Sequence, residues 1–421
     1  MYLRLISFMG LFAMVGIAWL LSRHKNRFPW RVVIGGVFLQ FMLAAVVFNT
    51  TGGQWLFQVI GDFFTQISGY VDEGTGLVFG IHPRGGDPEL PHSVTLLRTI
   101  AFGVLPTIIF FSSLMSILYH WGIMQWVVAV FAWVMQKTLH TSGAESLSAA
   151  ANIFVGQTEA PLVVRPYVLD MTESELMAVM VGGFATIAGG VMALYVQFGM
   201  APSHMMTASV ISAPAALLIA KVMMPEIEKP KTMGVVQVPI EQKTTNVIEA
   251  AAQGATDGMK LCINVAAMLI AFLALIAMLD ALIGWTGSLL GFADERQWSL
   301  ALFLGYGFAP IAWLMGIEGG DCVRAGELLG LKMAANELIA YARLSEWGQP
   351  DSGIKLSERS TLILTYALCG FANFGSIGIQ IGGIGGIAPE RRADLAKLGF
   401  RAMLGGTLAA FMTACVAGVM L

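Results

Sequence analysis

The chain has 421 residues, a formal net charge of −3 and 12% charged residues, against about 25% in an average soluble protein. Apolar residues make up 56% of the sequence, so the folded chain cannot cover itself with a water-soluble surface. The few basic residues form no patch of the kind that binds nucleic acid, and we expect no nucleic-acid partner. The composition therefore predicts an integral membrane protein.

Eight stretches are apolar and long enough to cross a membrane, which takes about 20 residues. They are 4–22, 31–49, 94–118, 176–199, 203–224, 261–291, 359–386 and 398–420. The first has no small-residue cleavage site after it and is expected to be a retained helix. The sequence thus predicts an all-α polytopic membrane protein with about eight transmembrane helices.

The polar segments between these stretches predict an interfacial helix and an orientation. Residues 54–71 place Gln and Asp side chains on one side and apolar side chains on the other, which is typical of a helix lying in the membrane interface. The basic segments 23–31 and 389–401 are expected in the cytoplasm, and the acidic segment 72–98 outside. A polar linker over 225–246 divides the chain near its middle.

Two further apolar stretches, 147–170 and 296–345, are interrupted by polar, glycine-containing motifs at 156–161 and 316–321. Non-helical backbone at membrane depth is stable only inside protein or beside a water-filled cavity. We therefore expect both stretches to form re-entrant helical hairpins.

The two halves of the chain repeat one order of motifs. A hairpin carrying a Gln-Thr-Glu sequence precedes the glycine-rich segment 183–190, and a hairpin carrying Asn-Glu precedes the glycine-rich segment 370–378. Paired, interrupted apolar segments are the best sequence indication of a binding site at the midplane of a transporter with an inverted repeat.

Two acidic residues within these hairpins, Glu159 and Glu337, are the strongest functional candidates. A carboxylate near the bilayer centre costs at least ~2.5 kcal/mol of insertion free energy, so we expect each of these acids to have a function. The alternatives are that the acid lies at a hairpin tip on the surface, or that it makes a structural hydrogen bond. Together with the amide of Gln157 and the hydroxyl of Thr158, the carboxylates suit a small polyhydroxylated or amide-bearing solute.

The glycine-rich segments 183–190 and 370–378 are expected to break their helices. Polar groups at the second of these broken helices could complete such a site. Asn373 and Ser376 are three residues apart and would share a helical face, and Phe371 could stack on a flat ring. Hydrogen bonding between helices is the alternative role for the two polar residues, and core or lipid packing the alternative role for the Phe.

A cation site is a further possibility at the first broken helix. The Asn152 amide oxygen, the Thr186 hydroxyl and backbone carbonyls freed at the break would form an oxygen cage for Na⁺. No HExxH zinc motif and no organic cofactor motif is present, and the four separated cysteines are expected to pack as apolar residues.

Three segments of the chain resemble a known family, the concentrative nucleoside transporters. Residues 152–167 resemble the signature of the family's first hairpin, and residues 330–341 resemble its G-x-K-x-x-x-N-E-F-V-A signature, with Leu338 and Ile339 in place of Phe and Val. Residues 371–376 match the later broken helix. The resemblance extends over roughly 94–420, with the three motifs in the family's order.

The resemblance implies an elevator-type secondary transporter that is usually a homotrimer. It implies a nucleoside site made of three groups of residues: Gln157, Thr158 and Glu159 at the base, with Gly156 beside them; Glu337, Asn373 and Ser376 at the ribose; and Val191, Phe371 and Ile379 as apolar walls. The implied sodium ligands are the side chains of Asn152 and Thr186 and the carbonyls of Val155 and Ile187.

The resulting expectation is a sodium-coupled symporter that imports nucleosides across a bacterial inner membrane. A proton-coupled nucleoside symporter is the alternative, with a channel or a membrane-embedded enzyme as weaker alternatives. The expected domains are scaffold spans and interfacial helix (1–120), first half of the transport domain (121–224), linker and amphipathic helix (225–260), scaffold span (261–291) and second half of the transport domain (292–421).

Overall fold

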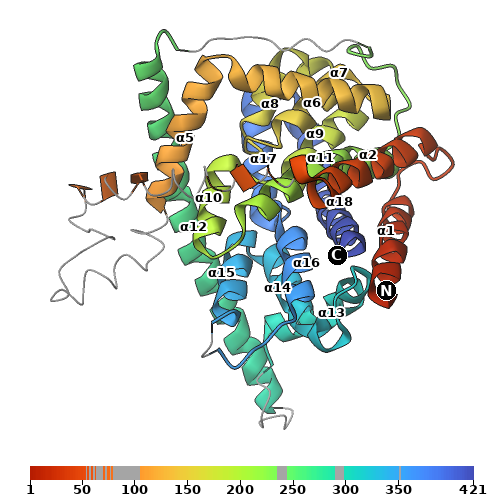
Figure 1. Cartoon of the computed structure of the whole chain (residues 1–421), viewed down its shortest axis with the longest axis vertical. Coiled ribbons are helices and arrows are strands. Elements are labelled where there is room, and N and C mark those ends of the chain that lie inside the picture. The colour runs from red at the N-terminus through yellow and green to blue at the C-terminus, as the bar shows by residue number, and fades with distance from the viewer. Residues whose placement is uncertain are drawn as a thin grey trace.

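The computed structural model describes residues 1–53, 105–234, 244–289, 298–349 and 352–421, and scattered residues between 55 and 78. Within these residues all regular structure is helical, which confirms the predicted fold class (Figure 1). The first half contains α1 (Tyr2–Leu20), α2 (Trp30–Asn49), α5 (Leu105–His120), α6 (Ile123–Leu139), α7 (Gly143–Ala151), α8 (Ala160–Val163), η2 (Arg165–Asp170), α9 (Glu173–Ala185), α10 (Gly189–Gln197) and α11 (Pro202–Met223). The second half contains α12 (Val247–Leu289), α13 (Leu300–Leu314), η3 (Gly319–Asp321), α14 (Cys322–Ala334), α15 (Glu337–Trp347), α16 (Glu358–Leu368), α17 (Phe374–Ile387), η5 (Pro389–Arg391) and α18 (Arg392–Met420).

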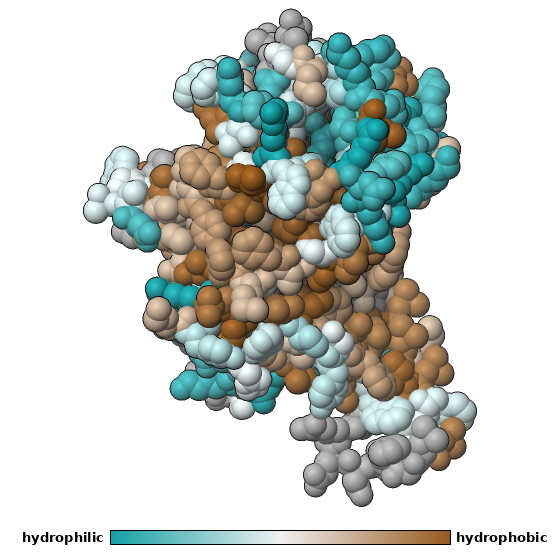
Figure 2. Space-filling model, turned by 90° about the vertical axis from the view of Figure 1, so that its right-hand side faces the viewer, coloured by the Kyte–Doolittle hydropathy of each residue, from teal (hydrophilic) through white to brown (hydrophobic). Residues whose placement is uncertain are grey.

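Four of the described helical segments are long and apolar enough to cross a membrane alone: α1, α2, α11 and the segment 389–420 that contains α18. Helices α5 and α6 meet the same test only as a pair, and they are bent by 80° with respect to each other. The surface in Figure 2 has a broad apolar region, with hydrophilic residues gathered at the end above it. This distribution is that of a protein whose middle faces lipid.

Two of the expected spans are broken helices, as the glycine clusters predicted. The span expected at 176–199 is divided into α9 and α10, and the span expected at 359–386 into α16 and α17. The two breaks lie against each other, because the Phe371 N–H donates to the Thr186 carbonyl at 3.3 Å. Gly370, with a φ of +128°, allows this approach: a Cβ there would lie 2.8 Å from the Ala185 carbonyl oxygen.

Both interrupted stretches form helix–turn–helix units. In the first, α7 ends at Ala151, and the chain returns through α8 and η2. In the second, the unit is shorter than the expected 296–345, because α13 is a separate apolar helix that packs along α14. Gly316, with a φ of +88°, makes the turn after α13, and the unit itself consists of α14 and α15 with Asn336 between them.

At one end of the molecule, α7, α9 and α11 are joined by a buried polar network. Capping boxes begin α7 (Ser142 with Glu145) and α9 (Thr172 with Glu175), and the Ser142 hydroxyl also donates to Glu175 at 2.5 Å. The Lys221 ammonium on α11 lies 2.7 Å from the Glu145 carboxylate. Removing one partner of such a pair would leave an uncompensated buried charge, at a cost of about 3–5 kcal/mol.

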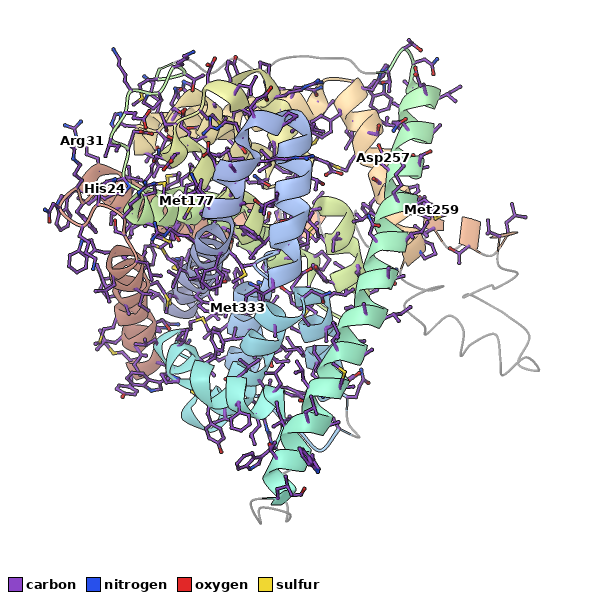
Figure 3. The ribbon with its side chains drawn as sticks, turned by 180° about the vertical axis from the view of Figure 1, so that it is seen from behind. His24, Arg31, Met177, Asp257, Met259 and Met333 are labelled. Carbon is purple, nitrogen blue, oxygen red and sulfur yellow. The ribbon has the colours of Figure 1, made fainter. Side chains whose placement is uncertain are left out.

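Helix α12 runs along one side of the molecule (Figure 3). It is 43 residues long, and it joins the amphipathic helix expected within 225–260 to the span expected at 261–291 without interruption. Gly254 and Gly258 let it approach α5 closely, since a Cβ at either position would lie 2.7 Å from backbone atoms of α5. The interfacial helix expected at 54–71, the segment 72–98 and the start of the span 94–118 lie largely or wholly outside the described residues.

Candidate functional site

The Glu337 carboxylate lies at the centre of a polar cluster inside the protein. It is the first residue of α15 and is 5% exposed. One carboxylate oxygen accepts a hydrogen bond from the Tyr195 hydroxyl of α10 at 3.0 Å, and the other accepts from the Asn373 amide nitrogen at 3.1 Å. The second hairpin is thus bonded to both broken helices.

The same cluster continues to the first hairpin. Asn373 caps α17, because its amide oxygen accepts the Ser376 N–H at 2.9 Å. The Ser376 hydroxyl accepts from the Gln157 amide nitrogen at 3.1 Å, and the Gln157 oxygen accepts from the Gln380 amide nitrogen, also at 3.1 Å. Four of the predicted nucleoside-binding residues therefore lie in one hydrogen-bonded chain that joins the two halves of the sequence: Gln157, Glu337, Asn373 and Ser376.

The second hairpin also supplies donors to the free end of α16. A helix leaves its last carbonyls without intrahelical partners, and α16 stops at Leu368 inside the protein. The buried Lys332 ammonium donates to the Ala367 carbonyl at 2.9 Å, and the Tyr341 hydroxyl donates to the Thr365 carbonyl at 2.7 Å. Lys332 is also close enough to Glu337 for an electrostatic interaction with its carboxylate.

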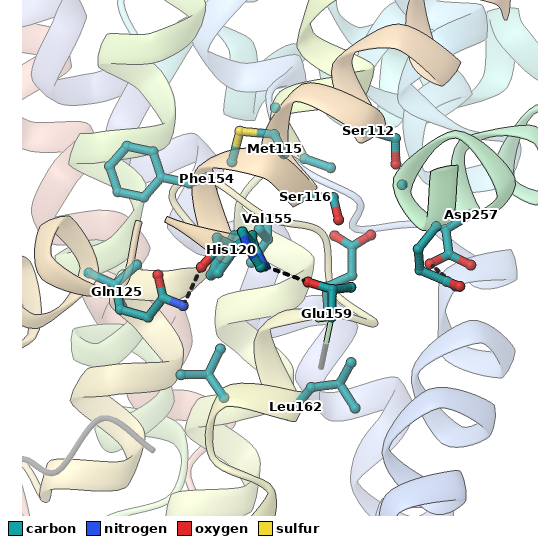
Figure 4. Close-up of a pocket in the computed structure, with 18 of the residues that line it drawn as sticks. Ser112, Met115, Ser116, His120, Gln125, Phe154, Val155, Glu159, Leu162 and Asp257 are labelled. Atoms are coloured by element: carbon teal, nitrogen blue, oxygen red, sulfur yellow. Dashed lines mark hydrogen bonds between the residues drawn. The ribbon is translucent and has the colours of Figure 1, made fainter. Parts of the chain in front are cut away.

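Glu159 faces a different part of the structure from the Glu337 cluster. Its carboxylate accepts from the Gly156 N–H at 2.8 Å and lines a cavity of about 300 Å³ between the first hairpin and helices α5 and α12. Figure 4 shows Glu159 directed toward the helices that carry Ser116 and Asp257. Glu337 is not among the residues that line this cavity.

The remaining predicted contacts are distributed between these regions. Thr158 packs against α17, since a Cβ at Gly383 would lie 3.3 Å from its methyl group. Val191 is buried on α10, whereas Phe371 and Ile379 are half-buried beside Asn373 and Ser376 in the sequence.

The four residues expected to bind sodium are all buried near the break between α9 and α10. The amide nitrogen of Asn152 donates to the Ser148 carbonyl at 3.0 Å, and among the described residues its buried amide oxygen has no hydrogen-bond partner. The Thr186 hydroxyl donates to the Gly182 carbonyl at 2.9 Å and keeps free lone pairs. An unpaired buried oxygen beside a broken helix fits a hard cation, whereas no cluster of His, Cys, Asp and Glu able to hold a metal occurs in the described ranges.

Sequence reasoning missed three residues of the cluster: Tyr195, Lys332 and Gln380. Tyr195 and Gln380 each lie four residues after a predicted site residue in an apolar helix, so they share its face, and this spacing was an available signal. The sequence left the roles of three acids open: Glu318, Asp321 and Asp280. Two of them make structural hydrogen bonds, because Asp280 accepts from the Leu300 N–H and Asp321 from the Ser357 N–H.

Family models match nearly the whole chain. The Na⁺ dependent nucleoside transporter N-terminus matches residues 9–81, the nucleoside recognition (gate) model matches 101–202, and the Na⁺ dependent nucleoside transporter C-terminus matches 204–418. The chain belongs to the concentrative nucleoside transporter family. Among its relatives is an uncharacterized transporter of Haemophilus influenzae, 45% identical over 99% of this chain and 97% of the relative.

Vertebrate and structural relatives give the same assignment. Solute carrier family 28 member 3 of Eptatretus stoutii is 42% identical over 99% of this chain, and the chain spans 60% of that relative's length. The structure of CNTnw in an inward-facing substrate-bound state has a TM-score of 0.92 at 41% identity, covering 99% of this chain and 98% of that one. A CNTnw variant in an outward-facing state has a TM-score of 0.91 at 40% identity, covering 100% and 98%. These relatives are transporters and not enzymes.

Proposed function

We propose that this protein is a sodium-coupled symporter that imports nucleosides across the bacterial inner membrane by an elevator-type mechanism. The observation that carries the proposal is the buried chain of hydrogen bonds from Glu337 through Asn373 and Ser376 to Gln157. It lies where both hairpins meet both broken helices. Nearly all of these side chains are closed to solvent, which is the condition under which polar groups discriminate between solutes.

The hydrogen-bonding groups in this buried series of side chains match those of a sugar joined to a base. The Glu337 carboxylate accepts hydrogen bonds strongly and would hold ribose hydroxyls together with Asn373 and Ser376. Gln157, Thr158, Glu159 and Gly156 of the first hairpin would contact the nucleobase. The apolar walls would come from Val191, Phe371 and Ile379. A solute without these hydroxyls would leave buried polar groups unpaired, at a cost of about 1–3 kcal/mol each.

Sodium would bind at the first break and order the first hairpin. Asn152 and Thr186 would supply side-chain oxygens, and Val155 and Ile187 backbone carbonyls. The Phe154 carbonyl already accepts from the Gly189 N–H at 3.0 Å, so the hairpin and the start of α10 are in contact at this point. An ion that stabilises this contact favours the conformation that binds solute, and the two affinities are then coupled reciprocally.

The cavity beside Glu159 supports movement of one part of the protein past another. One wall belongs to α5 and α12, and the other to the first hairpin and α10. We propose that 1–120 and 261–291 form the scaffold, that the re-entrant hairpins and broken helices (121–224 and 292–421) form the moving domain, and that 225–260 connects them. Related chains have been solved in inward-facing and outward-facing states.

Uptake of radiolabelled uridine into proteoliposomes tests the proposal. With sodium outside and none inside, we expect accumulation above equilibrium, and with choline outside no accumulation. The Asn152→Ala variant should need about ten times more sodium for half-maximal uptake, because it removes the unpaired buried oxygen, whereas Ser212→Ala, which removes a buried hydroxyl elsewhere, should behave like wild type. Uptake that does not depend on sodium and increases when the external pH is lowered would instead support proton coupling.

A further inference from the structure

The orientation of the Gln157 amide is fixed by a residue outside the predicted site. Gln380 lies on α17, one turn after Ser376, and is completely buried. Its amide nitrogen donates two hydrogen bonds, one to the Met180 backbone carbonyl at 3.0 Å and one to the Gln157 amide oxygen at 3.1 Å.

The direction of these bonds follows from the backbone. A backbone carbonyl can only accept, so the group of Gln380 that faces Met180 must be its amino group. The same amino group reaches Gln157, which must therefore present its oxygen to Gln380. The Gln157 amino group is left pointing the other way, toward the Ser376 hydroxyl at 3.1 Å. The Met180 carbonyl thus fixes the orientation of the Gln380 amide, and Gln380 in turn fixes which way the Gln157 amino group points.

Close packing holds both amides in place. A Cβ at Gly183 would lie 2.8 Å from the Gln380 amide nitrogen and 2.9 Å from the Gln157 Cβ. The amide oxygen of Gln380 is buried and has no hydrogen-bond partner among the described residues, so only the amino group's two bonds set the orientation of this amide. On the other side, the Ser376 N–H is already bonded to Asn373, which fixes the start of α17.

We propose that Gln380 is a positioning residue that makes Gln157 a hydrogen-bond donor toward the substrate. The site would then take the nucleobase through a ring carbonyl, as in uridine or inosine, in preference to the exocyclic amino group that cytidine or adenosine carries at the same ring position. The inference rests on the proposed function, because it assumes that Gln157 contacts a nucleobase.

The test compares the KM for uridine with the KM for cytidine in proteoliposome uptake. Both values come from the same preparation, so their ratio does not depend on the amount of folded protein. In Gln380→Met the amide of Gln157 can turn over, and we expect the KM of cytidine relative to uridine to fall about three- to tenfold. Gly183→Ala would place a methyl group against the Gln380 amide nitrogen and the Gln157 Cβ, so it displaces the same two residues and should shift the ratio in the same direction.

Gln40→Met is the matched control. Gln40 on α2 is also completely buried, donates to a backbone carbonyl (Gly36, 3.0 Å) and has an unpaired amide oxygen. We expect it to leave the ratio unchanged. Saturable uptake in which Gln380→Met and Gly183→Ala raise both KM values equally would overturn this inference and leave the proposed function standing. Wild-type protein that takes up neither nucleoside would overturn the proposed function, and the inference with it.

Discussion

Glu337 is a buried acid whose surroundings compensate for the loss of water. Tyr195 and Asn373 donate to its two oxygens, and the Lys332 ammonium provides the nearby positive charge. Burying a carboxylate is tolerated only when hydrogen bonds and a counter-charge replace its hydration. The bonds leave lone pairs on both oxygens, so the carboxylate can still accept from a bound solute.

We expect Glu337→Gln to fold but to lose most nucleoside transport. The Tyr195 hydroxyl can turn and accept from the new amino group, so the cluster keeps its hydrogen bonds. The charge-assisted bonds to the solute disappear, which corresponds to about 1.5–3 kcal/mol, or roughly a 10- to 100-fold loss of apparent affinity. Binding of uridine measured by calorimetry on detergent-purified protein checks the loss, and thermal unfolding checks the fold. Wild-type uptake by this variant would contradict the role given to Glu337.

Sequence reasoning selected four polar residues that the structure brings together, but it did not give their geometry. A polar side chain at membrane depth costs free energy and is therefore a functional candidate. This rule selected Gln157, Glu337, Asn373 and Ser376. The direction of Glu159 was not predictable, because neighbouring residues in an irregular hairpin turn point in directions that no helical period fixes. Gln380 was missed because its two partners lie 223 and 200 residues away in the chain.

The crossing of the two broken helices is the element on which the site is built. Each break leaves backbone groups unpaired, and the Phe371-to-Thr186 bond pairs one donor from the second break with one acceptor from the first. Gly370 makes this possible by its positive φ and its lack of a side chain. The glycine clusters indicated in the sequence that both helices would break, but no local pattern indicates that the two breaks touch.

Gly370→Ala is therefore expected to destabilise the protein and impair transport. The new Cβ would lie 2.8 Å from the carbonyl oxygens of Phe184 and Ala185, and a non-glycine residue at this φ adds roughly 1–3 kcal/mol of strain. Gly378→Ala, on α17 with open space around the added methyl, is the matched control and should change neither property. Thermal unfolding and uridine uptake of the two variants are compared. Equal behaviour would show that the breaks do not depend on this contact.

At the scale of the whole molecule, hydropathy predicted the class and most helix positions, because lipid imposes length and composition on each span. It did not predict that α12 would be one 43-residue helix, because an amphipathic helix within 225–260 and a span at 261–291 were expected as separate elements. A single helix that long extends about 65 Å, well beyond the thickness of a bilayer core. We therefore expect its polar start to project from the membrane.

The isolation of α12 argues for contacts between copies of the chain. In the part of the chain that the structure describes, α12 packs along α5 and only slightly against α13, and large apolar side chains such as Ile263 and Ile270 are exposed on one face seven residues apart.

We expect a homotrimer in which this face is covered, observed by native mass spectrometry in mild detergent at three times the chain mass. Ile263→Ala with Ile270→Ala should shift the population toward monomers, because about 2–5 kcal/mol of packing per deleted side chain is lost if the face is buried. Phe12→Ala, which removes an exposed apolar side chain from α1, should leave the trimer intact. A monomeric wild-type protein, or a trimer equally stable in the wild type and both variants, would mean that lipid alone covers α12.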